Sequence, residues 1–252
     1  MLAVHQVNVF TSMWRSGKKV LEAVMEEAKG KLTVIAHVGC NNTADSVELA
    51  AHAQSVGADA IASIPPIYFH LPEYAIAEYW NAMSAAAPDL DFVIYNIPQL
   101  AGTALSMNLL KEMLKNPNVI AVKNSSMPTQ DIQMFKAEGV KERGENGFVV
   151  FNGPDEQFVS GRAIGADGGI GGTYAVMPEL FVKMDQLIRE NNIAEAMKIQ
   201  YKARCDHLQD VRGKRKSLRS HERDFTQNVW SEAWKRQIAA CTFSTGRRGC
   251  CG

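Results

Sequence analysis

The chain has 252 residues, of which 46% are hydrophobic and 21% charged, and its formal net charge at pH 7 is zero. This composition is that of a globular protein, and the length suits one large α/β domain or two small ones. No stretch of about eighteen apolar residues is present, and the first residues lack the basic and apolar regions of a signal peptide. We therefore expect a soluble, cytoplasmic protein with no membrane partner.

The five cysteines predict neither a disulfide framework nor a metal site. Cys40 and Cys205 lie far apart in the sequence, whereas Cys241, Cys250 and Cys251 crowd the last dozen residues without metal-type spacing. No P-loop is present, and the glycines of 168–172 lack the spacing of a dinucleotide fingerprint. We expect no metal and no cofactor, and a nucleotide-binding fold is the weaker option.

The zero net charge conceals an acidic body and a basic tail. Residues 1–211 carry 17 Lys and Arg against 24 Asp and Glu, and residues 212–252 carry 10 against 3. Such a tail suits a nucleic acid or an anionic surface, but runs of Lys and Arg are more often simply solvated. We therefore expect no nucleic-acid partner.

Hydrophobic periodicity predicts strictly alternating strands and helices from residue 31 to 190. Residues 1–17 show neither periodicity and are predicted to supply no strand. The predicted strands are 32–38, 58–64, 91–95, 119–123 and 147–151, followed by the glycine-rich 166–174. The predicted helices are 18–29, one capped by Asn42 or Thr43, 73–86, one capped by Ser106, 129–137, one through 158–163, 178–189 and 193–208. Six βα units with short connections predict a parallel sheet, either open or closed into a barrel.

Two of the apolar strands end in reactive side chains, Tyr95 and Lys123. In a barrel of alternating strands and helices, the carboxyl ends of the strands carry the chemistry. Burial would depress the pKa of Lys123 towards neutrality, and its neutral amine could then attack a ketone to form a Schiff base. Tyr95 could shuttle a proton at that nitrogen. Taken singly, a strand-end lysine that points into water and a tyrosine that only packs are the favoured interpretations. The pair is more informative than either member.

Further candidates follow the later strands. Asp155 and Glu156 suit a hydroxyl-rich substrate because carboxylates accept strong hydrogen bonds, although acids at a helix N-terminus are also favoured by the helix dipole. Gly171 and Gly172 allow the backbone to approach a ligand closely. His37 is expected to pack beneath the site without a catalytic role.

Five motifs together carry a specific family resemblance. They are Ile35-Ala-His-Val-Gly-Cys40, Tyr95-Asn-Ile-Pro98, Val122-Lys-Asn-Ser-Ser126, Phe151-Asn-Gly-Pro-Asp-Glu156 and Gly165-Ala-Asp-Gly-Gly-Ile-Gly-Gly-Thr-Tyr174. From about residue 19 to 210 the chain resembles the N-acetylneuraminate lyases, class I aldolases of the dihydrodipicolinate synthase superfamily. The resemblance implies a (β/α)₈ TIM barrel with extra C-terminal helices, a homotetramer, and reversible cleavage of sialic acid to pyruvate and N-acetylmannosamine.

Carried over by position, the resemblance makes Lys123 the Schiff-base lysine and Tyr95 the proton donor or acceptor. It implies substrate-binding roles for Ser125, Gly153, Asp155, Glu156, Gly171, Gly172 and, less directly, Tyr68. Gly172 stands where some relatives have a serine, so only its backbone could serve. The Asp-Glu pair and the His-Val-Gly motif favour the sialic acid branch, because a polyhydroxylated tail needs acceptors that a compact dicarboxylic product does not.

Two alternatives remain open at the level of the sequence. One is another pyruvate-dependent aldolase, such as dihydrodipicolinate synthase or a keto-deoxy sugar acid aldolase. The other is a non-catalytic remnant whose basic tail binds nucleic acid.

The chain departs from the family pattern at both ends. We divide it into an aberrant segment 1–17, a partial (β/α)₈ barrel 18–211 and a basic, aberrant tail 212–252. Residues 1–17 lack the Gly-Gly-Ser-Ser/Thr-Gly-Glu turn that would hold the substrate carboxylate. If residues 1–8 are encoded ATG CTG GCG GTT CAT CAG GTG AAT, reading from one base earlier after a T yields Tyr-Ala-Gly-Gly-Ser-Ser-Gly-Glu. A comparable choice of codons for residues 214–226, shifted one base forward, yields Lys-Gly-Lys-Val-Tyr-Ala-Val-Met-Lys-Glu-Ile-Leu.

These decodings lead to the hypothesis that the reading frame is shifted at both ends. Six strands cannot close an eight-stranded barrel without open edges and an unburied core. We therefore predict low stability and weak or no activity for the chain as written.

Overall fold

A computed structural model describes residues 4–7, 14–174 and 177–212, and the side chains of 17–174 and 177–203. The chain divides into two compact units, residues 1–201 and 202–252. The strands of the described residues all belong to the first unit. The basic tail beyond Arg212, with the predictions made for it, lies outside the described residues.

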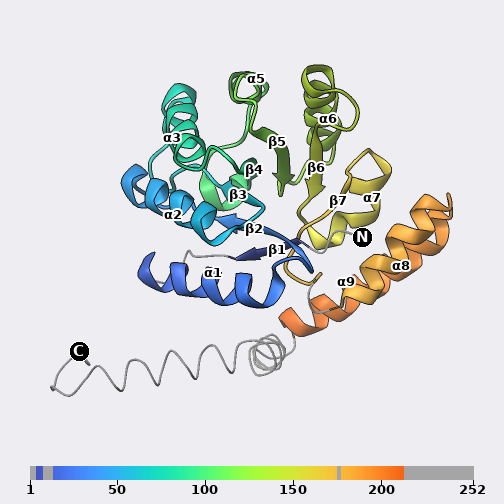
Figure 1. Cartoon of the computed structure of the whole chain (residues 1–252). Coiled ribbons are helices and arrows are strands. Elements are labelled where there is room, and N and C mark those ends of the chain that lie inside the picture. Colours follow the sequence, from blue (N-terminus) through green and yellow to red (C-terminus); the bar gives the residue numbers. More distant parts are fainter. Residues whose placement is uncertain (1–3, 8–13, 175–176, 213–252) are drawn as a thin grey trace, which may run out of the picture. The chain divides into compact units, whose positions relative to one another are not determined.

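Seven parallel strands form one sheet in which the spatial order equals the sequence order. Figure 1 shows them curling around a centre, with helices on the outside. The strands are β1 (Val4–Val7), β2 (Thr33–His37), β3 (Ala60–Ser63), β4 (Asp91–Asn96), β5 (Val119–Asn124), β6 (Val149–Asn152) and β7 (Gly168–Gly169). Parallel neighbours joined by helical crossovers are the arrangement of a (β/α) barrel.

The prediction that residues 1–17 contribute no strand is wrong. Residues 4–7 form β1, which pairs in parallel with β2 in the register Val4 with Thr33 through Val7 with Ala36. A segment of four residues is too short to show a period, and the unpaired edge of β2 supplies hydrogen-bond partners that no sequence pattern displays. The described sheet therefore has seven strands, not six.

The helices follow the predicted order, with differences at their ends. They are α1 (Trp14–Ala28), α2 (Thr43–Val56), α3 (Glu73–Ala86), α4 (Pro98–Ala101), α5 (Met107–Met113), α6 (Gln130–Arg143), η1 (Asp155–Gln157), α7 (Phe158–Ala163), α8 (Pro178–Arg189) and α9 (Ile193–Arg212). The two predicted N-caps are confirmed, because the side chains of Asn42 and Ser106 accept from the backbone N–H three residues on. The short α4 and η1 were not predicted, and α6 extends six residues beyond the prediction.

Side-chain alternation along the strands separates an outer core from an inner one. Outward residues such as Ile61, Phe92 and Val122 join the large cluster between sheet and helices. Inward residues form a smaller cluster: Ile35, Ala60, Ala62, Val93, Ala121, Phe151 and Ile170. Two residues further along the same inward rows stand His37, Tyr95 and Lys123, so the period of two that builds the core also directs these three into the barrel.

None of the helices in the described ranges is both long enough and apolar enough to span a membrane.

Candidate active site

Lys123 is the most unusual side chain of the barrel interior. It lies in β5, five residues into an apolar strand, and only 7% of its surface is exposed. Burial lowers the pKa of its amine to about 7, and the negative charge of Asp155 opposes part of that shift. An amine of pKa near 7 is about half unprotonated at neutral pH, and the unprotonated form is the state that a nucleophile requires.

Tyr95 lies directly beside this lysine in the sheet. The two residues are paired in the register of β4 with β5, and Lys123 Nζ lies 3.8 Å from the centroid of the Tyr95 ring. Burial raises the pKa of the Tyr95 hydroxyl, its hydrogen bond with the Ser125 side chain opposes the rise, and the charge of Asp155 adds to it. The predicted pairing is thus present, with the amine against the face of the ring and the hydroxyl bonded to Ser125.

His37 packs beneath Tyr95, as expected. Its ring is 1% exposed and meets the Tyr95 ring edge to face at 6.0 Å between centroids, while its Nε2 accepts from the backbone N–H of Ile64 at 3.3 Å. Burial, assisted by the nearby Lys123, lowers the pKa of His37 to about 3, so the imidazole stays neutral. It therefore adds no charge beside the lysine.

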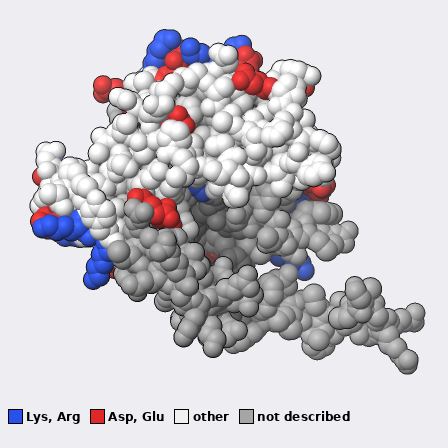
Figure 2. Space-filling model, turned by 180° about the vertical axis from the view of Figure 1, so that it is seen from behind, with Lys and Arg blue, Asp and Glu red and all other residues white. Residues whose placement is uncertain are grey.

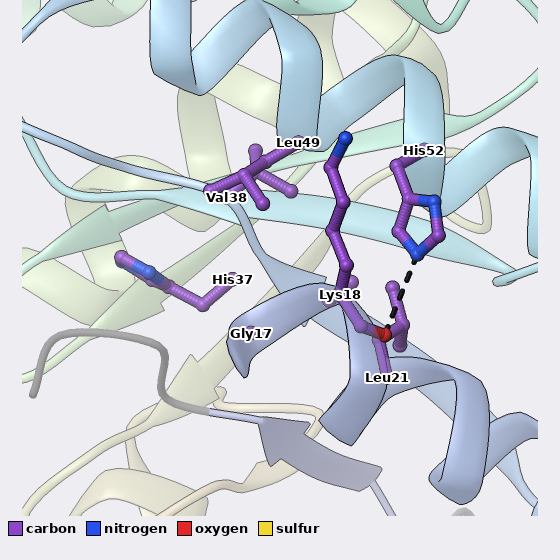
Figure 3. Close-up of a pocket in the computed structure, with 8 residues that line it drawn as sticks. Gly17, Lys18, Leu21, His37, Val38, Leu49 and His52 are labelled. Atoms are coloured by element: carbon purple, nitrogen blue, oxygen red, sulfur yellow. Dashed lines mark hydrogen bonds between the residues drawn. The ribbon is translucent and has the colours of Figure 1, made fainter. Parts of the chain in front are cut away.

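The other side of the same strand offers no room for a substrate. Figure 3 shows the His37 side chain pointing away from Lys18 and His52, which lie where α1 and α2 approach β2. The cavity there is about 10 Å³, space for no more than about one water molecule, and His52 Nε2 lies 3.4 Å from the backbone oxygen of Lys18. The reactive side chains Tyr95 and Lys123 lie on the inner side of the sheet instead.

Asp155 lies in η1, just past the end of β6, and is fixed by the segment that follows β7. Its Oδ2 accepts from both the backbone N–H and the side-chain hydroxyl of Thr173, each at 2.9 Å. Its charge acts on the pKa values of Lys123, Tyr95 and Tyr174. A carboxylate thus stands at the edge of the lysine site, while its neighbour Glu156 is exposed to solvent.

The three predicted substrate-binding glycines differ in how tightly they are enclosed. A Cβ on Gly153 would lie 1.9 Å from Ser125 Oγ, and one on Gly171 would lie 1.8 Å from Asp155 Oδ1. On Gly172 the nearest atom would be Asp155 Oδ2, at an ordinary 3.7 Å. The first two glycines therefore allow β5, β6 and the segment after β7 to close together, whereas a Cβ on the third would make only an ordinary contact.

Tyr68 stands apart from this cluster in the described part of the chain. It is 86% exposed, has a left-handed backbone with φ of 86°, and contacts the ring of Phe69 at 4.9 Å between centroids. No contact brings it to Lys123 or Asp155 within the described residues, so its role in substrate binding stays a prediction.

Three buried asparagines next to the site, on the outward side of their strands, were not singled out from the sequence. Asn96, Asn124 and Asn152 occupy one row of the sheet register, one step past Tyr95, Lys123 and Phe151. Asn96 Nδ2 donates to Asn124 Oδ1 at 2.7 Å, and Asn96 Oδ1 accepts from the backbone N–H of Leu105 at 2.9 Å. An asparagine after each of three buried strands was visible in the sequence, and its recurrence was the available signal.

The described residues contain no group of side chains with the makeup of a metal site. Within the described ranges, no group of three or more His, Cys, Asp or Glu side chains is arranged to hold an ion.

Comparison with known proteins places the chain in a family. The model of the Dihydrodipicolinate synthetase family matches residues 9–219, and the chain belongs to that family. It is 69% identical over 184 residues to an N-acetylneuraminate lyase of Mediterraneibacter gnavus, covering 73% of this chain and 57% of that protein. An N-acetylneuraminate lyase of an Enterobacter species is 38% identical, covering 77% of this chain and 63% of that protein.

Solved structures show the same relationship. A wild-type sialic acid aldolase of Ruminococcus gnavus superposes with a TM-score of 0.72 at 66% identity, covering 76% of this chain and 62% of that one. A catalytic lysine mutant of the same aldolase gives 0.74 at 65% identity, over 77% and 62%. The chain thus spans about three fifths of the length of the relatives that it matches.

Proposed function

We propose that the chain is built for reversible aldol cleavage of sialic acid to pyruvate and N-acetylmannosamine, through a Schiff base on Lys123. The observation that carries this proposal is a buried strand-end amine of pKa about 7 beside a tyrosine. The 69% identity to an N-acetylneuraminate lyase and the existence of a relative described as a catalytic lysine mutant support it.

The residues divide the proposed reaction between them. The neutral Lys123 amine adds to the ketone carbon of the substrate, and water leaves to give a protonated imine. The carbon–carbon bond then breaks as its electron pair moves towards the imine nitrogen, and Tyr95 relays the proton of the hydroxyl that becomes the aldehyde, accepting it as its own phenolic proton passes to the enamine carbon. Protonation of the resulting enamine and hydrolysis of the imine release pyruvate and restore the amine.

The sugar half of the substrate would meet the polar rim of the site. Asp155 and Glu156 would offer acceptors for hydroxyl groups, Ser125 a hydroxyl, and Gly153, Gly171 and Gly172 their backbone groups. The paired acceptors favour sialic acid over the compact dicarboxylate of a dihydrodipicolinate synthase. Product analysis with sialic acid, set against aspartate semialdehyde plus pyruvate, separates the two: dihydrodipicolinate as the sole product would overturn the assignment.

Borohydride reduction with pyruvate tests the lysine directly. The 252-residue protein should acquire the mass of one reduced pyruvate adduct, located on Lys123 by peptide mapping and lost in Lys123→Arg. Lys136 is an internal control, because its amine is bonded to Asp167 and to the backbone oxygen of Phe148. Adducts spread over surface lysines, or none on Lys123, would sink the proposal.

A homo-oligomer, a homotetramer by the family resemblance, forms part of the proposal. Large apolar side chains are exposed on the loops and helix ends that follow β3 and β4: Tyr68, Phe69, Tyr74 and Leu100. On the face shown in Figure 2, acidic and basic groups lie mainly near the edges and leave a wide uncharged area between them. Both features favour burial against another copy. Sedimentation of the purified chain as a monomer at micromolar concentration would contradict the proposed oligomer. The cytoplasmic location stays a prediction.

The division of the chain is also proposed here: segments 1–17 and 212–252 encoded in shifted frames around a partial (β/α)₈ barrel. The alignment to the Mediterraneibacter gnavus enzyme reaches 184 of the 252 residues, and the described sheet holds seven strands. Residues 4–7 do occupy a strand position, in β1. The proposal therefore concerns only how segments 1–17 and 212–252 are encoded. Codons that cannot yield the family-like peptides in another frame would end it. Cooperative unfolding together with normal turnover would contradict the predicted low stability and weak activity.

A further inference from the structure

The turn that carries Asp155 and Glu156 lacks a local cap. Neither η1 nor the six-residue α7 that follows it receives a side-chain hydrogen bond from its own N-cap residue. The first N–H groups of a helix have no partner within the helix, and leaving them unbonded in a buried place is costly. Some other part of the chain must satisfy them.

Gln200 of α9 supplies one of these missing bonds and adds a second bond to the main chain of the turn. Its Oε1 accepts from the backbone N–H of Val159 at 3.2 Å, and its Nε2 donates to the backbone oxygen of Asp155 at 3.0 Å. The side chain is 9% exposed. One buried amide, more than forty residues away in sequence, therefore holds both ends of the turn.

The side chain and the main chain of Asp155 are thus held by different elements. Thr173 fixes its carboxylate from the segment after β7, and Gln200 fixes its main chain from α9. The space at Gly171 leaves no room for the carboxylate to shift, because even a Cβ there would overlap it. A change in the main-chain position of Asp155 would therefore be transmitted to the sugar-binding edge of the site.

We propose that Gln200 is a positioning residue that, by clamping the turn from Asp155 to Val159, sets the sugar-binding edge of the site and leaves pyruvate capture to the strand residues. This inference rests on the proposed aldolase function for its kinetic consequence, although the clamp itself does not. It gives α9, which lies outside the sheet, a specific part in substrate selection.

Two variants separate the two halves of the clamp. Gln200→Met keeps the length of the side chain and removes both bonds, whereas Gln200→Glu keeps an acceptor for Val159 and loses the donor to Asp155. Gln186→Met on α8 is the matched control, since Gln186 is exposed and its amide bonds only to the surface side chains of Glu190 and Lys183.

Kinetics in the synthetic direction provide the discriminating measurement. Loss of one hydrogen bond corresponds to about a fivefold effect. We expect Gln200→Met to raise KM for N-acetylmannosamine at least about fivefold. KM for pyruvate and borohydride trapping on Lys123 should stay within about twofold of wild type. The KM of Gln200→Glu for N-acetylmannosamine should lie between those of Gln200→Met and wild type. Equal increases in both KM values, or the same increase in Gln186→Met, would overturn the positioning role.

Amide hydrogen exchange tests the clamp without any turnover. In Gln200→Met, exchange of the Val159 N–H should accelerate by about fivefold or more, and in Gln200→Glu by less, with helices remote from η1 unchanged. Unaltered exchange at Val159 in Gln200→Met would refute the clamp. A wild-type chain that captures no pyruvate would count against the aldolase function, and the exchange contrast would still decide the clamp.

Discussion

The titration of Lys123 leads to the most demanding prediction. An ordinary lysine with a pKa of 10.5 has about one amine in 3,000 neutral at pH 7, whereas a pKa of about 7 leaves about half neutral. Burial therefore increases the reactive fraction by roughly a thousandfold. The rate of imine formation with pyruvate should accordingly rise with pH and level off just above pH 7, not continue to increase towards pH 10.

The charge of Asp155 opposes this shift, so its removal has a predictable sign. Asp155→Asn should lower the pKa of Lys123 further and move the midpoint of the titration to lower pH. At pH 6 wild type has about one tenth of its amine neutral, so Asp155→Asn could accelerate pyruvate capture there by up to about tenfold. The same variant should lose sialic acid cleavage, because it loses an acceptor for the sugar.

Cyanoborohydride trapping of pyruvate between pH 5.5 and 9, followed by the mass of the Lys123 peptide, measures both effects. Glu156→Gln is the matched control: Glu156 is exposed, and its charge is not among those that shift the pKa of Lys123. A wild-type midpoint above pH 9, or an Asp155→Asn midpoint moved upward, would refute the electrostatic account of the site.

Three further predictions concern stability and shape. The pKa of Lys123 is lower in the folded chain than in the unfolded chain, so burial of the charged amine costs its full amount of stability below pH 7. This cost disappears as the pH rises from 7 to 10.5. In urea titrations, Lys123→Met should therefore stabilise the fold by roughly 3–5 kcal/mol at pH 6 and by little at pH 10.5. Gly171→Ala should lower kcat/KM for sialic acid by about tenfold or more, because its Cβ would overlap the Asp155 carboxylate. Gly172→Ala should change kcat/KM by less than about twofold. Equal effects would show that the close packing of Gly171 against Asp155 does not determine kcat/KM. Asn96→Ala leaves Leu105 N–H and Asn124 Oδ1 without their partner and should cost about 2–4 kcal/mol of unfolding free energy, against about 1 for Asn81→Ala, which loses one half-buried bond.

Local patterns along the chain were sufficient for most elements and for the central pair of the site. Apolar runs bounded by Asn, Pro or Gly predicted β2 to β6, because strands buried on both faces require such runs. The places of Tyr95 and Lys123 at the ends of two such runs predicted that both side chains lie at the carboxyl ends of neighbouring strands, and the register of β4 with β5 pairs them. These features depend on neighbours within a few residues, which a single sequence displays.

The tertiary structure decided what depends on distant partners. β1 exists as a strand because the edge of β2 is available to it, and four residues carry no period of their own. The neutral state of Lys123 results from the closing of β4, β5 and β6 around it, and Asp155 is fixed by Thr173 and Gln200 through bonds that span 18 and 45 residues. Burial and long-range hydrogen bonds arise only when the chain is folded, so no local pattern in the sequence could reveal them.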